Sequence, residues 1–161
     1  MSDVRAYTDG ACKNNPGKGG WGWVYFDTLP NSNALRFQDC GGETYTTNNR
    51  MELTAVIKLL ETVFEGKKYI IHSDSEYVLR GLVNGAAGSL RNPGDYTGWM
   101  KGWLSSGWKK PAKNQDLWKF LHAEIQRHLI HKTKLDFVWV KGHSNDLGND
   151  LADSLANQGV P

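Results

Sequence analysis

The chain has 161 residues, of which 39% are hydrophobic and 22% are charged, and its formal net charge is only +2. That length supports one domain with a buried core, and that composition excludes an intrinsically disordered chain. No segment approaches the roughly 18 consecutive apolar residues of a membrane-spanning helix, no apolar secretion signal precedes the first strand-like segment, and Cys12 and Cys40 are too few for a disulfide scaffold. We therefore expect a single domain over residues 1–161 that is monomeric, cytoplasmic and not bound to a membrane.

Three strands are predicted in the first quarter of the chain. Alternating or aromatic-rich segments typical of strands lie at Val4–Asp9, Trp21–Phe26 and Ala34–Cys40. Turn-forming residues separate these segments at 14–17 and 27–33. Such short connections favour antiparallel neighbours.

Helices alternate with strands in the rest of the chain. Cap residues at Thr46–Asn49 followed by apolar residues at helical spacing predict a helix that stops at Gly66. The following segments are predicted, in order: a strand at Lys68–Ser73, a helix at Ser75–Val83, an irregular loop at Asn84–Thr97, a short helix at Trp99–Leu104, a helix at Gln115–His131, a strand at Leu135–Val140 and a helix at Asn149–Gln158. This order implies a mixed sheet covered by helices, with parallel pairing among the strands that helices connect.

Basic and aromatic residues are concentrated in one segment. Residues 99–134 contain eight lysines and arginines but two acids, together with four of the seven tryptophans, so the remainder of the chain is acidic. Lysines interleaved with aromatic rings suit a polyanion that carries bases or sugars. Alternatively, Trp99 and Trp103, four residues apart, form the core face of an amphipathic helix whose lysines are merely solvated.

Three acids stand where their chemistry needs an explanation. Asp9 and Asp74 each follow a predicted strand, and parallel neighbours would bring both to the sheet edge where α/β proteins bind ligands. Either residue could instead form a turn or cap a helix. Glu52 lies on the apolar face of its helix with Val56 and Leu59, where an unpaired carboxylate is costly, although it could also favour the helix N-terminus.

A fourth acid begins the last helix, where Asp150 and Asp153 lie one turn apart. The pair could reflect the helix dipole alone, or one member could face a cluster of Asp9, Glu52 and Asp74. Carboxylates that converge repel by roughly 4 kcal/mol per pair at about 4 Å, and hard divalent cations such as Mg²⁺ or Mn²⁺ relieve that repulsion. Two such ions form the usual device for phosphodiester hydrolysis.

One histidine stands close to these acids in the sequence. His143 lies in Lys141-Gly142-His143-Ser144, just before the last helix. A mobile histidine near metal ions and phosphate is a candidate for proton transfer, although most isolated loop histidines have no catalytic role.

Together these residues resemble the type 1 ribonucleases H. The motifs that carry the resemblance occur in the family's order and cover essentially the whole chain: Thr8-Asp9-Gly10, Asn15-Pro16-Gly17, Thr46 through Leu53, Ser73 through Val78, Trp139 through His143, and Asn149 through Ala156. Any one motif is weak, whereas the combination is specific. The resemblance implies an α/β ribonuclease H-like fold with a mixed five-stranded sheet of order 3-2-1-4-5, in which the first three strands are antiparallel.

The resemblance also implies roles for individual residues. It makes Asp9, Glu52, Asp74 and Asp153 the metal-binding acids, with Asp153 selected over Asp150, and His143 a flexible loop histidine that helps the product leave. The nucleic-acid contacts that it implies are Asn15, Asn48 and Glu76 to the minor groove of a hybrid duplex, Thr47 to a phosphate of the DNA strand, and Trp99, Trp103, Lys109 and Lys110 in a basic protrusion at 99–113.

Three features depart from the family's pattern. Residues 85–96 resemble an insertion ahead of the protrusion, and Leu104-Ser105-Ser106 stands where basic residues are common. Glu76 stands where glutamine is frequent, and an acid is poorly placed beside phosphate. Hybrid binding and its salt dependence are therefore expected to be weaker than in strongly basic members of the family.

The implied activity is endonucleolytic cleavage of the RNA strand of RNA–DNA hybrids. The cofactors are expected to be two Mg²⁺ ions, for which Mn²⁺ can substitute, and the products 5′-phosphate and 3′-hydroxyl ends with little sequence specificity. Two other readings stay open at this point: a non-catalytic hybrid-binding module with a vestigial metal site, and an integrase-type or junction-cleaving nuclease.

Overall fold

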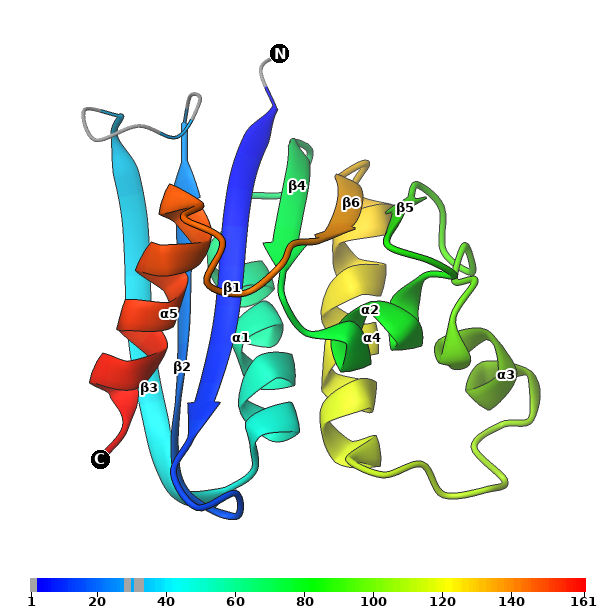
Figure 1. The fold of residues 1–161 in the computed structure, drawn as a ribbon. Helices are drawn as coiled ribbons and strands as arrows, with labels where there is room; N and C mark the ends of the chain where they lie inside the picture. Colours follow the sequence, from blue (N-terminus) through cyan, green and yellow to red (C-terminus); the bar gives the residue numbers. More distant parts are fainter. Residues whose placement is uncertain (1–2, 28–29, 31–33) are drawn as a thin grey trace.

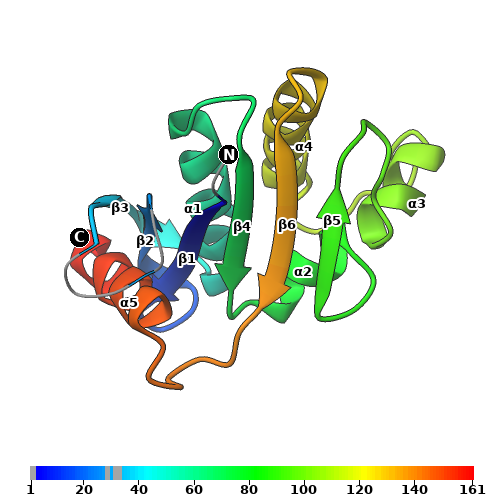
Figure 2. The same ribbon diagram turned by 90° about the horizontal axis from the view of Figure 1, so that it is seen from above.

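The computed structural model describes residues 3–27, 30 and 34–161, which form a single mixed sheet covered by helices on both faces (Figure 1). The sheet has six strands in the order β3-β2-β1-β4-β6-β5. Figure 2 shows α5 on one face of the sheet and α1 and α4 on the other. The elements are β1 (Val4–Cys12), β2 (Gly17–Phe26), β3 (Arg36–Thr46), α1 (Asn48–Thr62), β4 (Lys68–Ser73), α2 (Glu76–Leu82), β5 (Ala87–Leu90), α3 (Trp99–Ser105), α4 (Gln115–Ile130), β6 (Lys134–Trp139) and α5 (Leu147–Gly159).

Strand pairing follows the predicted pattern and confirms the fold class. β1, β2 and β3 are antiparallel neighbours, while β4 pairs in parallel with both β1 and β6. Successive side chains of β1 enter opposite cores: Ala6 packs in the larger cluster with α1 and α4, and Tyr7 packs in the smaller one under α5. No described helix has the length and apolarity needed to cross a membrane.

The predicted strand count was wrong by one. The segment expected to be an irregular loop at 84–97 contains β5, which pairs antiparallel with β6 from Ala87↔Val138 to Leu90↔Leu135. The order is therefore 3-2-1-4-6-5 rather than 3-2-1-4-5. The strand was missed because it is short, contains Gly88, and is held by a partner far along the chain.

The third strand was predicted too short. It runs to Thr46 rather than Cys40, because Gly41 and Gly42 continue the ladder with Trp21 and Gly20 of β2. A Cβ at Gly42 would lie 2.1 Å from the carbonyl oxygen of Gly159, so a glycine is required where the end of α5 crosses the sheet. The start of this strand differs by two residues, and most of the predicted turn at 27–33 lies outside the described residues.

Candidate active site

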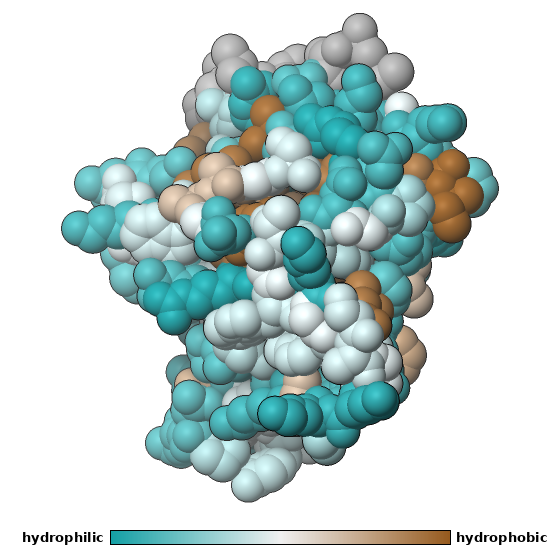
Figure 3. All heavy atoms as spheres, turned by 90° about the vertical axis from the view of Figure 1, so that its right-hand side faces the viewer, coloured by the Kyte–Doolittle hydropathy of each residue, from teal (hydrophilic) through white to brown (hydrophobic). Residues whose placement is uncertain are grey.

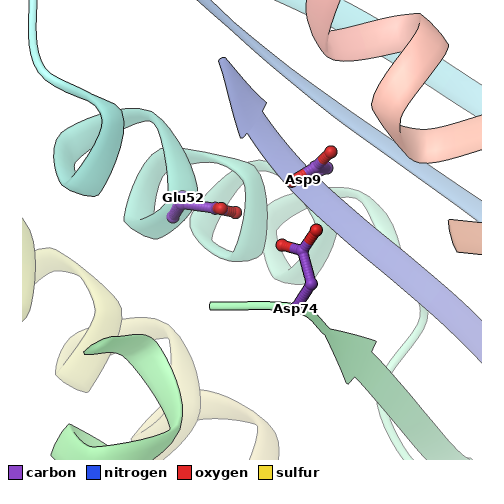
Figure 4. Close-up of side chains that lie close together, drawn as sticks. All are labelled: Asp9, Glu52 and Asp74. Atoms are coloured by element: carbon purple, nitrogen blue, oxygen red, sulfur yellow. The ribbon is translucent and has the colours of Figure 1, made fainter. Parts of the chain in front are cut away.

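Three carboxylates meet at one edge of the sheet. β1 and β4 are parallel neighbours in register at Thr8↔Ser73, so the next residue of each, Asp9 and Asp74, emerges at the same edge. Glu52 reaches them from the first turns of α1 (Figure 4). Each of these residues offers a carboxylate oxygen within 4.8 Å of the other two. The expected convergence is confirmed, but the first strand was predicted too short: β1 continues to Cys12 through its pairing with β2, so Asp9 lies inside the strand, where only the pairing with β4 ends.

A glycine lets α1 approach β1 closely enough for this meeting. A Cβ on Gly10 would lie only 2.5 Å from the backbone nitrogen of Glu52, so any larger residue would push the helix away. Thr47 caps α1, and its side-chain oxygen accepts a hydrogen bond from the backbone N–H of Arg50 at 3.2 Å. The cap and the close contact together fix the position of α1 along β1, and therefore the position of Glu52 relative to Asp9.

Burial makes the charged forms of these acids unfavourable. Asp9 and Glu52 are only 3% and 4% exposed, and Glu52 Oε1 has no hydrogen-bond partner among the described residues. Burial first, then the charge of Asp74 and hydrogen bonds with Asp74 and Asp153, raise the pKa of Asp9 to about 8. Burial and the same neighbours raise the pKa of Glu52 well above its ordinary value.

This arrangement fits a cation. Unpartnered carboxylate oxygens that repel one another are stabilised by a positive charge, and an all-oxygen ligand set favours a hard ion such as Mg²⁺ over Zn²⁺. The backbone N–H of Gly10 donates to Asp9 Oδ1 at 2.9 Å, while the other neighbours of Asp9 are carboxylates that a bound cation would bridge. The carboxylate oxygens of Asp9 and Glu52 that face one another are thus available to a metal ion.

Asp153 and His143 line the same pocket from the other side. The pocket has a volume of about 380 Å³, and its described lining includes Asp153 of α5 but not Asp150. Asp153 does not belong to the tight group of three, whose oxygens lie closer to one another. His143 is exposed on the loop between β6 and α5, with a left-handed backbone (φ 56°). The structure therefore places all five predicted catalytic residues around one pocket.

The four predicted minor-groove and phosphate contacts lie at the mouth of this pocket. Asn48 and Glu76 line it, and the side-chain oxygen of Asn15 accepts a hydrogen bond from the backbone N–H of Asn48 at 2.9 Å. Thr47 lies beside them with its hydroxyl engaged in the helix cap. Asn49, Ser75 and Tyr77 also line the pocket, although only their places inside the quoted motifs pointed to them.

The tryptophans of the basic segment divide between the two predicted roles. Trp118 is fully buried, and Trp103 packs against both it and Trp108, with ring centroids 5.3 and 5.5 Å apart, as the core interpretation expects. Trp99 is 41% exposed, so part of its ring is available to a ligand. Lys109 and Lys110 are exposed in the segment after α3 and do not line the acidic pocket.

One contact at the site was not predicted, although its residue opens one of the quoted motifs. The indole N–H of Trp139, at the end of β6, donates to the backbone carbonyl of Asp74 at 3.1 Å. This bond holds the peptide that carries one of the three acids. No sequence pattern indicates it, because it joins two strand ends that are more than sixty residues apart in the chain.

Solved structures with similar coordinates support the fold. LC9-RNase H1, described as a type 1 RNase H with the type 2 active-site motif, superposes with a TM-score of 0.75 at 24% identity over 98% of this chain and 72% of its own. LC11-RNase H1, crystallised in complex with an RNA/DNA hybrid, has a TM-score of 0.64 at 21% identity and covers 98% of this chain and 96% of its own. At such identities the likeness shows a shared fold alone.

Sequence relatives are much closer. A protein named Ribonuclease H from Marinobacter nauticus is 44% identical over 166 residues, which cover 98% of this chain and 93% of that protein. A protein named Ribonuclease HI from Caulobacter vibrioides is 42% identical over 161 residues, with 98% and 92% covered. The RNase H family profile matches residues 1–161. The chain therefore belongs to the RNase H family of enzymes.

Proposed function

We propose that this chain hydrolyses the RNA strand of RNA–DNA hybrids at the pocket formed by Asp9, Glu52 and Asp74. The observation that carries the proposal is the convergence of three carboxylates within 4.8 Å, one of which has a buried oxygen with no hydrogen-bond partner in the described part of the chain. Membership of the RNase H family supports the same reaction, and a structural neighbour, LC11-RNase H1, was crystallised with an RNA/DNA hybrid.

Asp9, Glu52, Asp74 and Asp153 would hold two Mg²⁺ ions, for which Mn²⁺ can substitute. Bound ions of this kind supply a metal-activated water and stabilise the leaving oxygen of a phosphodiester. The chain's own contribution is to orient the ligands before substrate arrives. The Gly10 N–H holds the Asp9 carboxylate, the Trp139 indole holds the Asp74 carbonyl, and the packing of α1 on Gly10 holds Glu52.

His143 supplies a proton carrier at the edge of this pocket. Its side chain is exposed on a loop whose neighbouring Gly142 lies against Asp74, where a Cβ would come 3.0 Å from Oδ2. From that place it can exchange protons with solvent and with a phosphate held at the acids. Cleavage gives one fragment with a 5′-phosphate end and one with a 3′-hydroxyl end. We propose that His143 helps the 5′-phosphate product to leave the site.

The protein selects a hybrid through separate contacts to its RNA strand and to its DNA strand. Asn15, Asn48 and Glu76 surround the mouth of the pocket, where 2′-hydroxyl groups of the RNA strand identify it. Thr47 at the same mouth, with Trp99, Trp103, Lys109 and Lys110 in the segment beyond α2, would contact the DNA strand. Contacts of this kind position the duplex without reading its bases, so little sequence specificity is expected. We propose that the enzyme acts in this way as a cytoplasmic monomer.

Asp9→Asn tests the proposal directly. With a hybrid labelled on either strand and Mg²⁺ or Mn²⁺ present, the wild-type protein is expected to cut the RNA strand alone. Asp9→Asn should abolish cutting but keep hybrid binding, since it removes a metal ligand and leaves the surface otherwise unchanged. Asp150→Asn, one turn from Asp153 and exposed, is the matched control and should cut normally.

Three results would contradict the proposal. Cleavage by Asp9→Asn at the wild-type rate would exclude the metal assignment. Preferential cutting of double-stranded or branched DNA by the wild-type protein would exclude the substrate. RNA products that end in a 3′-phosphate would exclude the proposed direction of bond breaking.

A further inference from the structure

A second, larger groove adjoins the acidic pocket. Its volume is about 960 Å³, and it lies between α2, α3 and the segment that follows α2. Glu76 lines both the groove and the acidic pocket, so the two hollows share a wall. Trp139 also lines the groove while its indole N–H holds the carbonyl of Asp74. A ligand that lies across the acidic pocket therefore has this groove as the next surface to occupy.

Residues 84–98 form one wall of the groove, and the two ends of this segment lie next to each other. Its ends are joined, because the backbone N–H of Asn84 donates to the Thr97 hydroxyl at 2.9 Å and the N–H of Thr97 donates to the Leu82 carbonyl at 3.2 Å. The backbone N–H of Trp139 donates to the Ala86 carbonyl at 2.7 Å, directly before β5 joins the sheet. This wall is thus fixed to the end of β6.

The groove has only two charged side chains among its described lining residues. Glu76 and Arg80 lie four residues apart on α2, and glutamate followed by arginine at this spacing is the order that favours an ion pair. The described residues nevertheless include no hydrogen-bond or ion-pair partner for the Arg80 side chain, which is exposed. Arg50, Arg91 and Arg127, in contrast, each lie within an ion pair.

We propose that Arg80 contacts a backbone phosphate of the RNA–DNA hybrid, in the part of the groove that lies beyond Glu76 as seen from the acids. The inference rests on the proposed function. A guanidinium presents a planar fork of donors that matches a phosphate, and here no acid occupies it. Repulsion by Glu76 places the phosphate toward Arg80, one helical turn farther from the acidic pocket. The facing wall contributes Gly102 and Trp103, which carry no charge, so Arg80 is the cation of this groove.

Figure 3 shows the side of the molecule that carries α3 and β5, on the right in Figure 1. Its surface is mainly hydrophilic or neutral, and strongly hydrophobic residues form separate patches rather than a continuous apolar face. A sugar–phosphate backbone suits such a surface better than an apolar partner does. Trp99 and Trp139 also line the groove and give it aromatic surface against which sugars can pack.

Salt-dependent binding tests the contact. A fluorescent hybrid is titrated without divalent metal ions at several KCl concentrations, and log Kd is plotted against log[KCl]. Arg80→Gln is expected to weaken binding roughly tenfold at moderate salt and to reduce the slope by about 0.9, the value for one phosphate contact. Arg80→Lys should retain the slope. Arg36→Gln removes the same charge from β3, at the opposite edge of the sheet, and should change Kd by less than about twofold.

Neutral methylphosphonate linkages, introduced one at a time into each strand, locate the phosphate. One linkage should weaken binding by the wild-type protein and have no further effect on Arg80→Gln, because both changes remove the same contact. The linkage found in this way should lie in the DNA strand, because Trp99 and Trp103 of the same groove are proposed to contact that strand. The effect of Arg80→Gln should persist in a Glu76→Gln background, which excludes a role limited to neutralising Glu76.

Steady-state cleavage separates this inference from the proposed function. With Mg²⁺, Arg80→Gln should raise KM several-fold and leave kcat unchanged, since the groove lies apart from the reacting phosphate. If the wild-type protein cleaves hybrids but Arg80→Gln behaves like Arg36→Gln, or no linkage is coupled to Arg80, the contact does not exist and the proposed function stands. If the wild-type protein does not cleave hybrids, the proposed function itself is wrong.

Discussion

The position of Asp9 at the site reduces the stability of the metal-free protein. Its pKa is raised from 3.8 to about 8, first by burial and then by Asp74, so the folded protein binds this proton more tightly than the unfolded chain does. The stability that the folded protein gains by binding this proton is fully present at low pH, below the pKa of Asp9 in the unfolded chain. It is lost as the pH rises through the pKa of Asp9 in the folded protein. The ionised form of Asp9 therefore destabilises the fold, and the protein retains it because the site needs a metal ligand there.

Asp9→Asn should therefore stabilise the metal-free protein at alkaline pH. We expect a gain of roughly 2 kcal/mol in the free energy of unfolding at about pH 9, and almost no gain below about pH 3, where Asp9 is largely protonated in both states. Urea denaturation in the presence of EDTA measures this difference. An Asp9→Asn protein no more stable than wild type at the higher pH would show that burial and Asp74 do not destabilise the ionised form of Asp9 in solution.

Trp139 offers a second test at the residue scale, because its hydrogen bond to Asp74 can be removed without removing its ring. Trp139→Phe should lower kcat roughly three- to tenfold and raise the Mg²⁺ concentration needed for half-maximal activity, since one hydrogen bond is worth about 1 kcal/mol. KM for the hybrid should stay within about twofold of wild type. A variant whose KM alone changes would indicate that Trp139 acts only as a wall of the groove.

The sequence predicts some of these residues and not others, for a physical reason. Asp74 follows a strand end and Glu52 lies on a helix face, as local periodicity predicts, whereas Asp9 lies inside β1, where the pairing with β4 ends and that with β2 continues. Their meeting follows from the parallel pairing of β1 with β4. Trp139 follows the same strand periodicity as its neighbours. Its bond to Asp74 depends on how two strand ends pack in space, which no local pattern encodes.

At the scale of elements, α5 reaches the site because β2 presents glycines to it. A Cβ on Gly22 would lie 2.6 Å from the Cβ of Leu155 and 2.7 Å from the backbone nitrogen of Ala156. The helix that carries Asp153 thus lies against bare backbone, and its distance from the sheet is set by the absence of a side chain. Gly10 does the same for α1 on the opposite face.

Gly22→Ala should consequently displace α5. We expect a loss of about 1–3 kcal/mol in the free energy of unfolding, as for other overpacked sites, together with lower activity because Asp153 moves. Gly102→Ala is the matched control for stability: it lies within α3 with nothing within 4 Å of the added methyl group, and should stabilise the protein by about 0.5–1 kcal/mol. Thermal unfolding of both variants measures the contrast. Equal effects of the two substitutions would contradict the close packing of α5.

These glycines also explain where the prediction of elements failed. Glycine weakens a strand pattern, so the expected third strand stopped before Gly41 and the fifth strand, with Gly88, was read as a loop. In the structure, the same residues allow close approach: the ring of Trp21 would lie 2.5 Å from a Cβ on Gly41. The contacts that make a glycine strand-like are tertiary, and they become visible only when the partner element is in place.

At the scale of the whole molecule, the small net charge of +2 is the sum of two unlike parts. The acids that gather at the sheet edge come from the N-terminal half and α5, whereas the basic, tryptophan-rich residues 99–134 form α3, α4 and the segment between them. Part of that segment is core, since Trp118 is fully buried. The separation of charge could be predicted from the sequence, but the division of tryptophans between core and surface could not, because it depends on the packing of α3 against α2 and α4.

The acid cluster couples metal binding to the stability of the entire chain, and that coupling should depend on pH. A ligand that binds only the folded state stabilises it by an amount that grows with its concentration relative to Kd. At about pH 6, Mg²⁺ must displace protons from Asp9 and Glu52, whose pKa values are raised, whereas at about pH 9 Asp9 is already ionised.

We expect saturating Mg²⁺ to raise Tm by several degrees more at the higher pH, since about 1 kcal/mol corresponds to roughly 2–4 °C in a protein of this size. Asp9→Asn should show a smaller shift at both pH values, and Asp150→Asn the full wild-type pattern. Shifts that are equal at the two pH values would mean that Mg²⁺ binds elsewhere, because only a site built from these raised acids exchanges protons for metal.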